Sequence, residues 1–261
     1  HGGTVYCLAS YDAGSKKLVT LSHPFSVDVD SAKMEFYEPE KETEDVVLFS
    51  KFGMIGEFFL GRMVGGVFEG SRSPGFEHPD TLFRIKDMPL RLCTAVRVDS
   101  TKTYRYVRYF GPRGGFGNVS EVGFYSSWAD TEPLKGDILG PQEGAHGSHS
   151  YFNVFDGHTD TSYDHPFDYG GWAGLDLGEK KAIGKIVYTP RNRDNFVRKD
   201  DLYELLVCHG GEWKSAGTQV AQSDSLLFRN IPKHALLLLR DLSRGEAERL
   251  FEYKDGVQKY W

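Results

Sequence analysis

Short runs of alternating apolar and polar residues, each bounded by turn-forming residues, recur along the chain. Alternation with a period of two places the apolar side chains on one face of an extended segment, so these runs predict half-buried β-strands. Helical periodicity is weak throughout. The pattern therefore predicts an all-β protein, built as sandwiches. The clearest predicted strands are residues 4–8, 17–21, 45–49, 104–109, 183–189, 202–208 and 236–239.

Glycine and aromatic residues strengthen the all-β interpretation. Glycine supplies 30 of the 261 residues, and aromatic residues make up 14 % of the chain. Glycine adopts positive φ in tight turns, and aromatic rings pack well on pleated sheets. The pair Gly210-Gly211, between strand-like runs at 203–208 and 213–215, predicts a β-hairpin. The length favours about two domains.

Charge, hydropathy and cysteine content exclude several classes of protein. The net charge of −6 argues against a nucleic-acid binder, which needs a concentrated basic face. No run reaches the roughly 18 apolar residues of a membrane-spanning helix. Cys7, Cys93 and Cys208 are odd in number and widely spaced, which predicts buried free thiols. The chain begins at His1 without a methionine or signal peptide, which we interpret as the start of a fragment.

Internal similarity indicates a repeated fold. The segment Val67-Phe68-Glu69-Gly70-Ser71 resembles Val154-Phe155-Asp156-Gly157-His158. Two later pairs follow in the same order, residues 105–108 with 237–240 and residues 120–122 with 247–249. The common order predicts two copies of one fold, the first lacking a middle portion, with chance similarity as the alternative.

A stretch rich in proline and glycine marks the predicted boundary between these copies. Residues 127–150 contain Pro133, Pro141 and several glycines, which predicts a linker and an irregular start of the next domain. We therefore predict a β-rich lead-in plus a degenerate sandwich over residues 1–126, and an intact β-sandwich over residues 151–261.

Four motifs in the second half resemble discoidin domains, also called coagulation factor five/eight type C domains. In chain order the motifs are Phe155-Asp156-Gly157 with Thr161 and Tyr163, Trp172 with Leu175-Asp176-Leu177-Gly178, Ile186 with Tyr188-Thr189-Pro190-Arg191, and Ala247-Glu248 with Phe251. This family includes the family-32 carbohydrate-binding modules, and the resemblance implies a galactose-binding-like jelly-roll sandwich. The first half matches less well, keeping residues 68–71, 104–109 and 118–125. We therefore predict that its sandwich is degenerate.

The resemblance also implies a function. It points to a non-catalytic carbohydrate-binding region appended to a secreted or cell-surface enzyme, with a glycan or polysaccharide and the parent catalytic domain as partners. The whole arrangement is similar to C-terminal regions of secreted proteins from gut Bacteroidetes.

Oxygen-bearing residues after the first motif predict a possible structural calcium site. Calcium takes six to eight oxygen ligands from carboxylates, carbonyls and waters. Asp156 and Thr161 lie in one loop, and the resemblance adds Glu248 from a later strand. The alternative is an Asx-turn without metal. An EF-hand is excluded because Thr161 stands at the required glycine, and the histidines at 146, 149, 158 and 165 leave zinc as a weaker option.

Sugar recognition needs an aromatic platform and planar polar groups. The loops around the first motifs supply Tyr163, His165, Tyr169 and Trp172, followed by Arg191, Asn192, Arg193 and Asn195. We predict Tyr163, His165, Trp172, Arg191, Asn192 and Asn195 as ligand-binding residues. Two alternatives stay open: Trp172 packs in the core, and Arg191 pairs with a carboxylate such as Asp176.

Two other functions compete with carbohydrate binding. The region could be a scaffold that packs on a catalytic domain. It could also be a glycan-processing enzyme, although no known catalytic signature is present. Candidate carboxylate pairs for such an enzyme are Asp200-Asp201 and Asp164 with Asp168.

Overall fold

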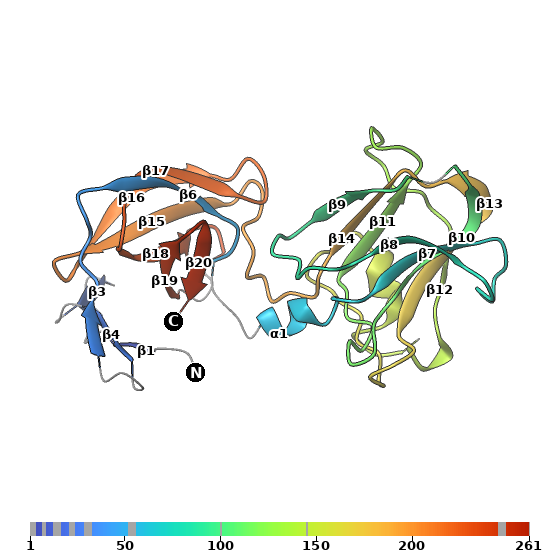
Figure 1. Cartoon of the computed structure of the whole chain (residues 1–261), viewed down its shortest axis with the longest axis horizontal. Helices are drawn as coiled ribbons and strands as arrows, with labels where there is room; N and C mark the ends of the chain where they lie inside the picture. Colours follow the sequence, from blue (N-terminus) through green and yellow to red (C-terminus); the bar gives the residue numbers. More distant parts are fainter. Residues whose placement is uncertain are drawn as a thin grey trace. The chain divides into compact units, whose positions relative to one another are not determined.

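The computed structural model describes residues 4–6, 9–12, 17–20, 24–28, 33–51, 56–99, 101–144, 146–244 and 249–260. Antiparallel strands dominate it (Figure 1), which confirms the all-β prediction. The chain forms two compact units. Unit 1 consists of His1–Met54 together with Asn195–Trp261, and unit 2 of Ile55–Asp194. Unit 2 is therefore inserted into the sequence of unit 1.

Unit 1 combines strands that precede and follow unit 2 in the sequence. Its largest sheet has the order β16 (Glu212–Val220), β15 (Leu202–His209), β18 (Leu236–Asp241), β19 (Leu250–Lys254) and β20 (Val257–Tyr260). Smaller sheets comprise β1 (Thr4–Tyr6) with β4 (Phe25–Asp28) and β5 (Lys33–Phe36), β2 (Ala9–Asp12) with β3 (Lys17–Thr20), and β6 (Thr43–Leu48) with β17 (Leu226–Pro232). The β6–β17 pair joins segments about 180 residues apart, so neither end of the chain completes unit 1 alone.

The predicted hairpin is confirmed at β15–β16. His209 pairs with Glu212, and the intervening Gly210 and Gly211 adopt φ of 60° and 83°. Two successive positive φ values belong to a tight turn whose twist matches that of the flanking strands, and glycine adopts them without steric cost.

The two connections to unit 2 lie beside each other in unit 1. Ser50 and Phe196 form an isolated antiparallel bridge, and the Lys51 backbone N–H donates to the Asn195 carbonyl oxygen at 2.7 Å. The chain thus leaves unit 1 and returns to it at neighbouring positions. Because these two connection points lie so close together, unit 1 can accommodate a whole domain inserted between them.

Unit 2 is a two-layer sandwich. One sheet has the order β12 (Asp137–Leu139), β13 (Trp172–Ala182), β10 (Thr103–Phe110), β7 (Val67–Ser71) and β8 (Asp80–Arg84). The other has the order β11 (Glu121–Tyr125), β14 (Lys185–Thr189) and β9 (Thr94–Arg97). The short helices are α1 (Gly56–Gly61), η1 (Gln142–Gly144) and η2 (Tyr151–Phe155).

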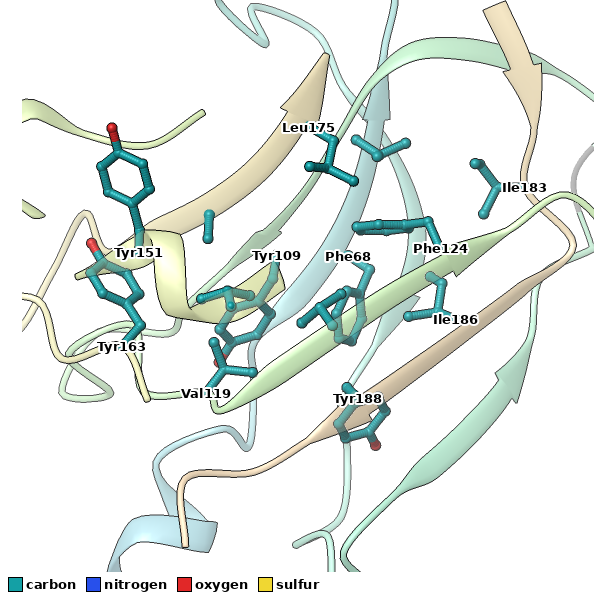
Figure 2. Close-up of a cluster of buried hydrophobic side chains, with 14 of the residues drawn as sticks. Phe68, Tyr109, Val119, Phe124, Tyr151, Tyr163, Leu175, Ile183, Ile186 and Tyr188 are labelled. Atoms are coloured by element: carbon teal, nitrogen blue, oxygen red, sulfur yellow. The ribbon is translucent and has the colours of Figure 1, made fainter. Parts of the chain in front are cut away.

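Side chains from both sheets of unit 2 form its core (Figure 2). Phe68 of β7 lies at the centre, with its ring centroid 5.3 Å from Tyr109, 6.2 Å from Phe124 and 5.3 Å from Tyr188. Tyr109 belongs to the same sheet as Phe68, whereas Phe124 and Tyr188 come from the three-stranded sheet. Burying these rings is the main source of stability of the sandwich.

The units do not follow the predicted domain boundaries. β10 pairs with β13 along its length, so the predicted linker at 127–150 lies inside unit 2 rather than between domains. The supposed repeat also differs in structure, because residues 67–71 form strand β7, whereas Val154 and Phe155 belong to the 3-10 helix η2. A short sequence pattern does not determine which partner strand a segment finds, and here the partners differ.

Cysteine burial was predicted correctly for one of the two described cysteines. Cys208 is buried, Cys93 is exposed, and Cys7 lies outside the described residues. Among the described residues, no helix has the length and apolar character needed to cross a membrane.

Candidate functional site

Three loops meet at one end of the unit 2 sandwich, which we call the loop end. They are residues 111–120, 156–171 and 190–194. Gly111 N–H donates to the Gly171 carbonyl oxygen at 2.9 Å, His165 N–H to that of Phe116 at 2.7 Å, and Asn192 Nδ2 to that of Thr159 at 2.8 Å. These bonds tie the loops to one another, so their side chains are held in fixed positions.

Gly117 allows the closest of these approaches. It has φ of +63°, and a Cβ there would lie 2.7 Å from the Tyr163 ring. A side chain at this position would strain the backbone and displace the ring. The sequence Gly-Gly-Phe-Gly at 114–117 is thus suited to bringing the first loop against the second.

A chain of aromatic rings runs from the core to the surface of the loop end. Tyr151 contacts Tyr163 at 6.3 Å between centroids, and Tyr163 contacts His165 at 6.1 Å. His165 contacts Phe167 at 5.7 Å, and Phe167 contacts Tyr169 at 6.0 Å. The sequence alternates ring and non-ring residues over 163–169, which places each ring against the next.

Tyr163 and His165 are the buried part of this chain. Their exposed fractions are 0 % and 4 %, and the Tyr163 hydroxyl lies 3.0 Å from His165 Nδ1. Burial lowers the pKa of His165 and raises that of Tyr163, because both charged forms are disfavoured away from water. Both residues were predicted to touch ligand. The structure instead places them beneath the surface, where they support other rings.

Phe167 and Tyr169 are the exposed part. Their exposed fractions are 48 % and 57 %, and their rings stack with only 23° between the planes. The Arg113 guanidinium lies 5.8 Å from the Tyr169 ring centroid. Tyr169 was among the loop aromatics predicted from the sequence, whereas Phe167 was missed. The signal that could have found the pair is an alternating Phe-Asp-Tyr run in a loop, where rings two apart lie on one side.

Arg191 belongs to a polar network beside the rings. Its Nη1 donates to Asp164 Oδ2 at 2.5 Å and to Asn118 Oδ1 at 3.5 Å. Arg62 Nη1 donates to the same Asn118 oxygen at 2.8 Å, and Asn118 Nδ2 donates to Asp164 Oδ1 at 2.7 Å. The anticipated carboxylate partner of Arg191 is therefore Asp164. Asp176 instead accepts two hydrogen bonds from Arg105, at 2.7 and 2.9 Å.

The three remaining predicted ligand residues have different surroundings. Asn192 is buried and serves to bind the loops, since its Nδ2 also donates to the Pro190 carbonyl oxygen at 3.1 Å. Asn195 lies in unit 1. Trp172 is half-buried, with its ring 5.9 Å from that of Phe76. Of the six predicted residues, Tyr163, His165, Arg191 and Asn192 lie in the loops of the loop end.

Oxygen atoms gather at the start of the second loop. Asp156 Oδ1 accepts from the His158 N–H at 2.8 Å, and Asp156 Oδ2 accepts from the Thr161 hydroxyl at 2.8 Å. This is the Asx-turn that the sequence left as an alternative. Glu121 of β11 adjoins it, because Gly157 N–H donates to Glu121 Oε2 at 3.1 Å. Glu248 lies outside the described residues.

Glu121 is the most perturbed carboxyl group at the loop end. Burial raises its pKa to about 8, and the neighbouring Asp156 carboxyl adds to the shift. In the sequence, Glu121 stood out only as the counterpart of Glu248 in the supposed repeat. In the described part of the chain, no group of three or more His, Cys, Asp or Glu side chains could hold a metal ion.

Comparisons with known proteins return nothing: no family model matches the chain, and neither a curated protein nor a solved structure resembles it.

Proposed function

We propose that unit 2 is a discoidin-like carbohydrate-binding module in which the motifs occur in a rotated chain order. Three of the four motifs, at residues 155–163, 172–178 and 186–191, lie within unit 2. The fourth, at 247–253, is replaced by its counterpart Ser120-Glu121-Val122 at the start of β11, which pairs with β14. What we predicted as two copies is then one sandwich whose closing strand precedes its opening motif.

The stacked and exposed pair Phe167–Tyr169 is the single observation that carries the binding function. A sugar ring presents an apolar face that packs on aromatic rings, and its hydroxyls need planar polar groups nearby. Arg113 beside Tyr169 supplies donors of this kind. The rings rest on buried Tyr163 and His165, so they are pre-organised and lose little freedom when a ligand binds.

A glycan array followed by affinity electrophoresis tests this function. We expect the whole chain to be retained by at least one neutral glycan. Phe167→Ala should weaken that retention about tenfold, which corresponds to about 1.4 kcal/mol. Phe152→Ala is the matched control, because Phe152 is 47 % exposed and likewise ends the ring chain. Equal effects of the two substitutions, or no retention by any glycan, would contradict the proposal.

We also propose a structural calcium ion at Asp156, Thr161 and Glu121. Two carboxylates, a hydroxyl and nearby backbone carbonyls are the oxygen ligands that calcium prefers. The raised pKa of Glu121 fits this assignment, since a cation is what would stabilise its charged form next to Asp156. Glu121 thus takes the role that the sequence analysis gave to Glu248.

Thermal unfolding with calcium or with a chelator tests the ion. A ligand at about 100 times its dissociation constant stabilises the folded state by about 2.7 kcal/mol, so calcium should raise the melting temperature. Glu121→Gln should abolish that rise, while Glu132→Gln, an exposed control, should leave it unchanged. A rise that persists in Glu121→Gln would assign the ion to another place.

For unit 1 we propose a scaffold role, in keeping with a module carried on a secreted or cell-surface protein. Unit 1 holds both connections of the inserted sandwich next to each other, through Ser50–Phe196 and Lys51–Asn195. Deleting residues 55–194 and rejoining the connections with a short flexible linker should leave unit 1 folded and remove glycan binding.

A further inference from the structure

A cluster of cations and aromatic rings lies on unit 2 away from the loop end. Arg97, Lys185 and Tyr125 stand opposite one another across β9, β14 and β11, which lie side by side (Figure 1). Directly opposite residues in an antiparallel sheet share one face. Their sequence neighbours Ile186 and Phe124 are fully buried in the core. The Arg97–Lys185–Tyr125 row therefore lies on the outer face of the three-stranded sheet.

Trp128 covers this row and remains open to solvent. Its ring centroid is 4.8 Å from the Arg97 guanidinium and 5.9 Å from the Lys185 ammonium. The side chain is 45 % exposed, although burying an indole is favourable. Lys185 also lies 4.1 Å from the centroid of the Tyr125 ring. Two rings and two cations thus share one surface, which we call the Trp128 patch.

Neighbouring groups fix the position of the patch. Ser127 N–H and its hydroxyl donate to the two Asp130 carboxylate oxygens at 3.0 and 2.6 Å, which closes the turn that carries Trp128. The Asp130 carbonyl oxygen in turn accepts from Lys185 Nζ. The patch is thus held by bonds on both sides of Trp128, so its rings and cations keep their arrangement without a ligand.

Arg97 is the more accessible of the two cations of the patch. Arg97 is exposed and stacks on Trp128, but it forms no hydrogen bond or ion pair with any described residue. The carboxylate of Asp130 is bound by Ser127, and its pKa is lowered by that hydrogen bond. The Arg97 guanidinium lies over the Trp128 ring, and the planar fork of a guanidinium is suited to bind two oxygens of one anionic group.

We propose that the Trp128 patch is a second glycan site of unit 2 that binds an acidic sugar, one bearing a carboxylate or a sulfate. The apolar face of the sugar packs on Trp128, and its anionic group takes the Arg97 fork with Lys185 adding attraction. The two sites differ in ligand class, because the loop end offers uncharged rings with a mixed polar network, whereas this patch offers cations. The second site does not depend on Phe167 or Tyr169.

Affinity electrophoresis of the whole chain tests the second site. The probes are polygalacturonate, its fully methyl-esterified form, and chondroitin sulfate. We expect retention by polygalacturonate or by the sulfated glycan, and much weaker retention by the ester, which keeps the sugar backbone but lacks the charge. The strength of retention by each acidic probe tells whether a carboxylate or a sulfate is preferred. Retention should fall as salt is raised.

Substitutions assign that retention to the patch. Arg97→Gln and Trp128→Ala should each weaken it about tenfold, since each removes a charge-assisted or stacking contact. Arg72→Gln, an exposed arginine after β7, is the control and should change it less than about twofold. Phe167→Ala should leave it unchanged while weakening neutral-glycan retention about tenfold, so the two sites can fail separately. Equal retention by the ester, no retention by either acidic glycan, or loss on Phe167→Ala alone would overturn the proposal.

Discussion

Unit 1 and unit 2 are both antiparallel β-structures, yet they differ in what they expose. Among the described residues, the large exposed hydrophobic side chains of unit 1 include a single aromatic ring, Phe36. Unit 2 exposes four, Trp128, Phe152, Phe167 and Tyr169. Exposed rings on a fixed framework are the feature that sugar-binding surfaces need. This difference is what we expect if unit 1 has the proposed scaffold role and unit 2 the proposed binding role.

The units also differ in how they hold polar groups. Unit 1 buries an ion pair, with Lys51 Nζ and Asp241 Oδ2 at 3.0 Å and only 2 % and 1 % of the side chains exposed. It joins the segment beside the insertion to the end of β18. Unit 2 places its corresponding network, Arg191 with Asp164, at the loop end with partial exposure. A buried pair contributes to a unique arrangement, whereas an exposed network remains open to a ligand.

Breaking the buried ion pair of unit 1 should have the strongest effect, and it tests whether the two units unfold independently. Lys51→Met leaves the Asp241 carboxylate buried without its cation, so it should destabilise unit 1 by about 3–5 kcal/mol. Chemical denaturation followed by fluorescence should then show unit 1 unfolding earlier, with neutral-glycan binding by unit 2 kept. The matched control is Lys233→Met, whose pair with Glu42 is exposed and worth about 0–1 kcal/mol. Simultaneous loss of binding and unit 1 stability would mean that the units are not independent.

A smaller effect concerns Glu121 in the presence of a chelator. Its pKa of about 8 in the folded state lies above the ordinary 4.5. Between these values the folded state binds more protons than the unfolded state, so stability should fall as pH rises from about 5 to 8. Because the group is partly exposed, we expect a loss of about 1–2 kcal/mol. Glu121→Gln should flatten this dependence, and an unchanged slope would remove Glu121 as its source.

A weaker effect is expected at Tyr163, where a substitution tests whether this residue supports the exposed rings or contacts the glycan. Tyr163→Phe keeps the ring and removes the hydroxyl that faces His165 Nδ1. If the residue is a support, unit 2 loses about 1 kcal/mol of stability and keeps most of its glycan affinity. A loss of affinity of tenfold or more without a change in thermal unfolding would return Tyr163 to the ligand contacts that the sequence predicted.

The strands could be predicted because alternation of apolar residues is a local property. Residues 104–109, 183–189 and 202–208 were predicted as strands, and β10, β14 and β15 lie there. The insertion could not be predicted in this way. The pairing of β6 with β17 depends on contacts between segments far apart in sequence, which a local pattern does not record.

The candidate site was predicted in part for a similar reason. The type of a residue does not tell whether its side chain is buried. Tyr163 and Tyr169 belong to the same loop, yet Tyr163 is buried and Tyr169 is exposed. For the same reason, the sequence did not indicate whether Glu121 or Glu248 would join Asp156 in the proposed calcium site. Both follow a small residue at the start of a strand-like run, and the hydrogen bond from Gly157 N–H to Glu121, at the start of β11, depends on the tertiary fold.

We propose that the inserted sandwich, unit 2, binds sugar without the help of unit 1. Isothermal titration of the separately produced residues 55–194 with the best neutral glycan from the array tests it most directly. We expect the same dissociation constant as for the whole chain within about twofold, and no heat of binding from the chain lacking residues 55–194. Binding by the chain that lacks the insertion, or its absence from a folded residue 55–194 fragment, would contradict the account.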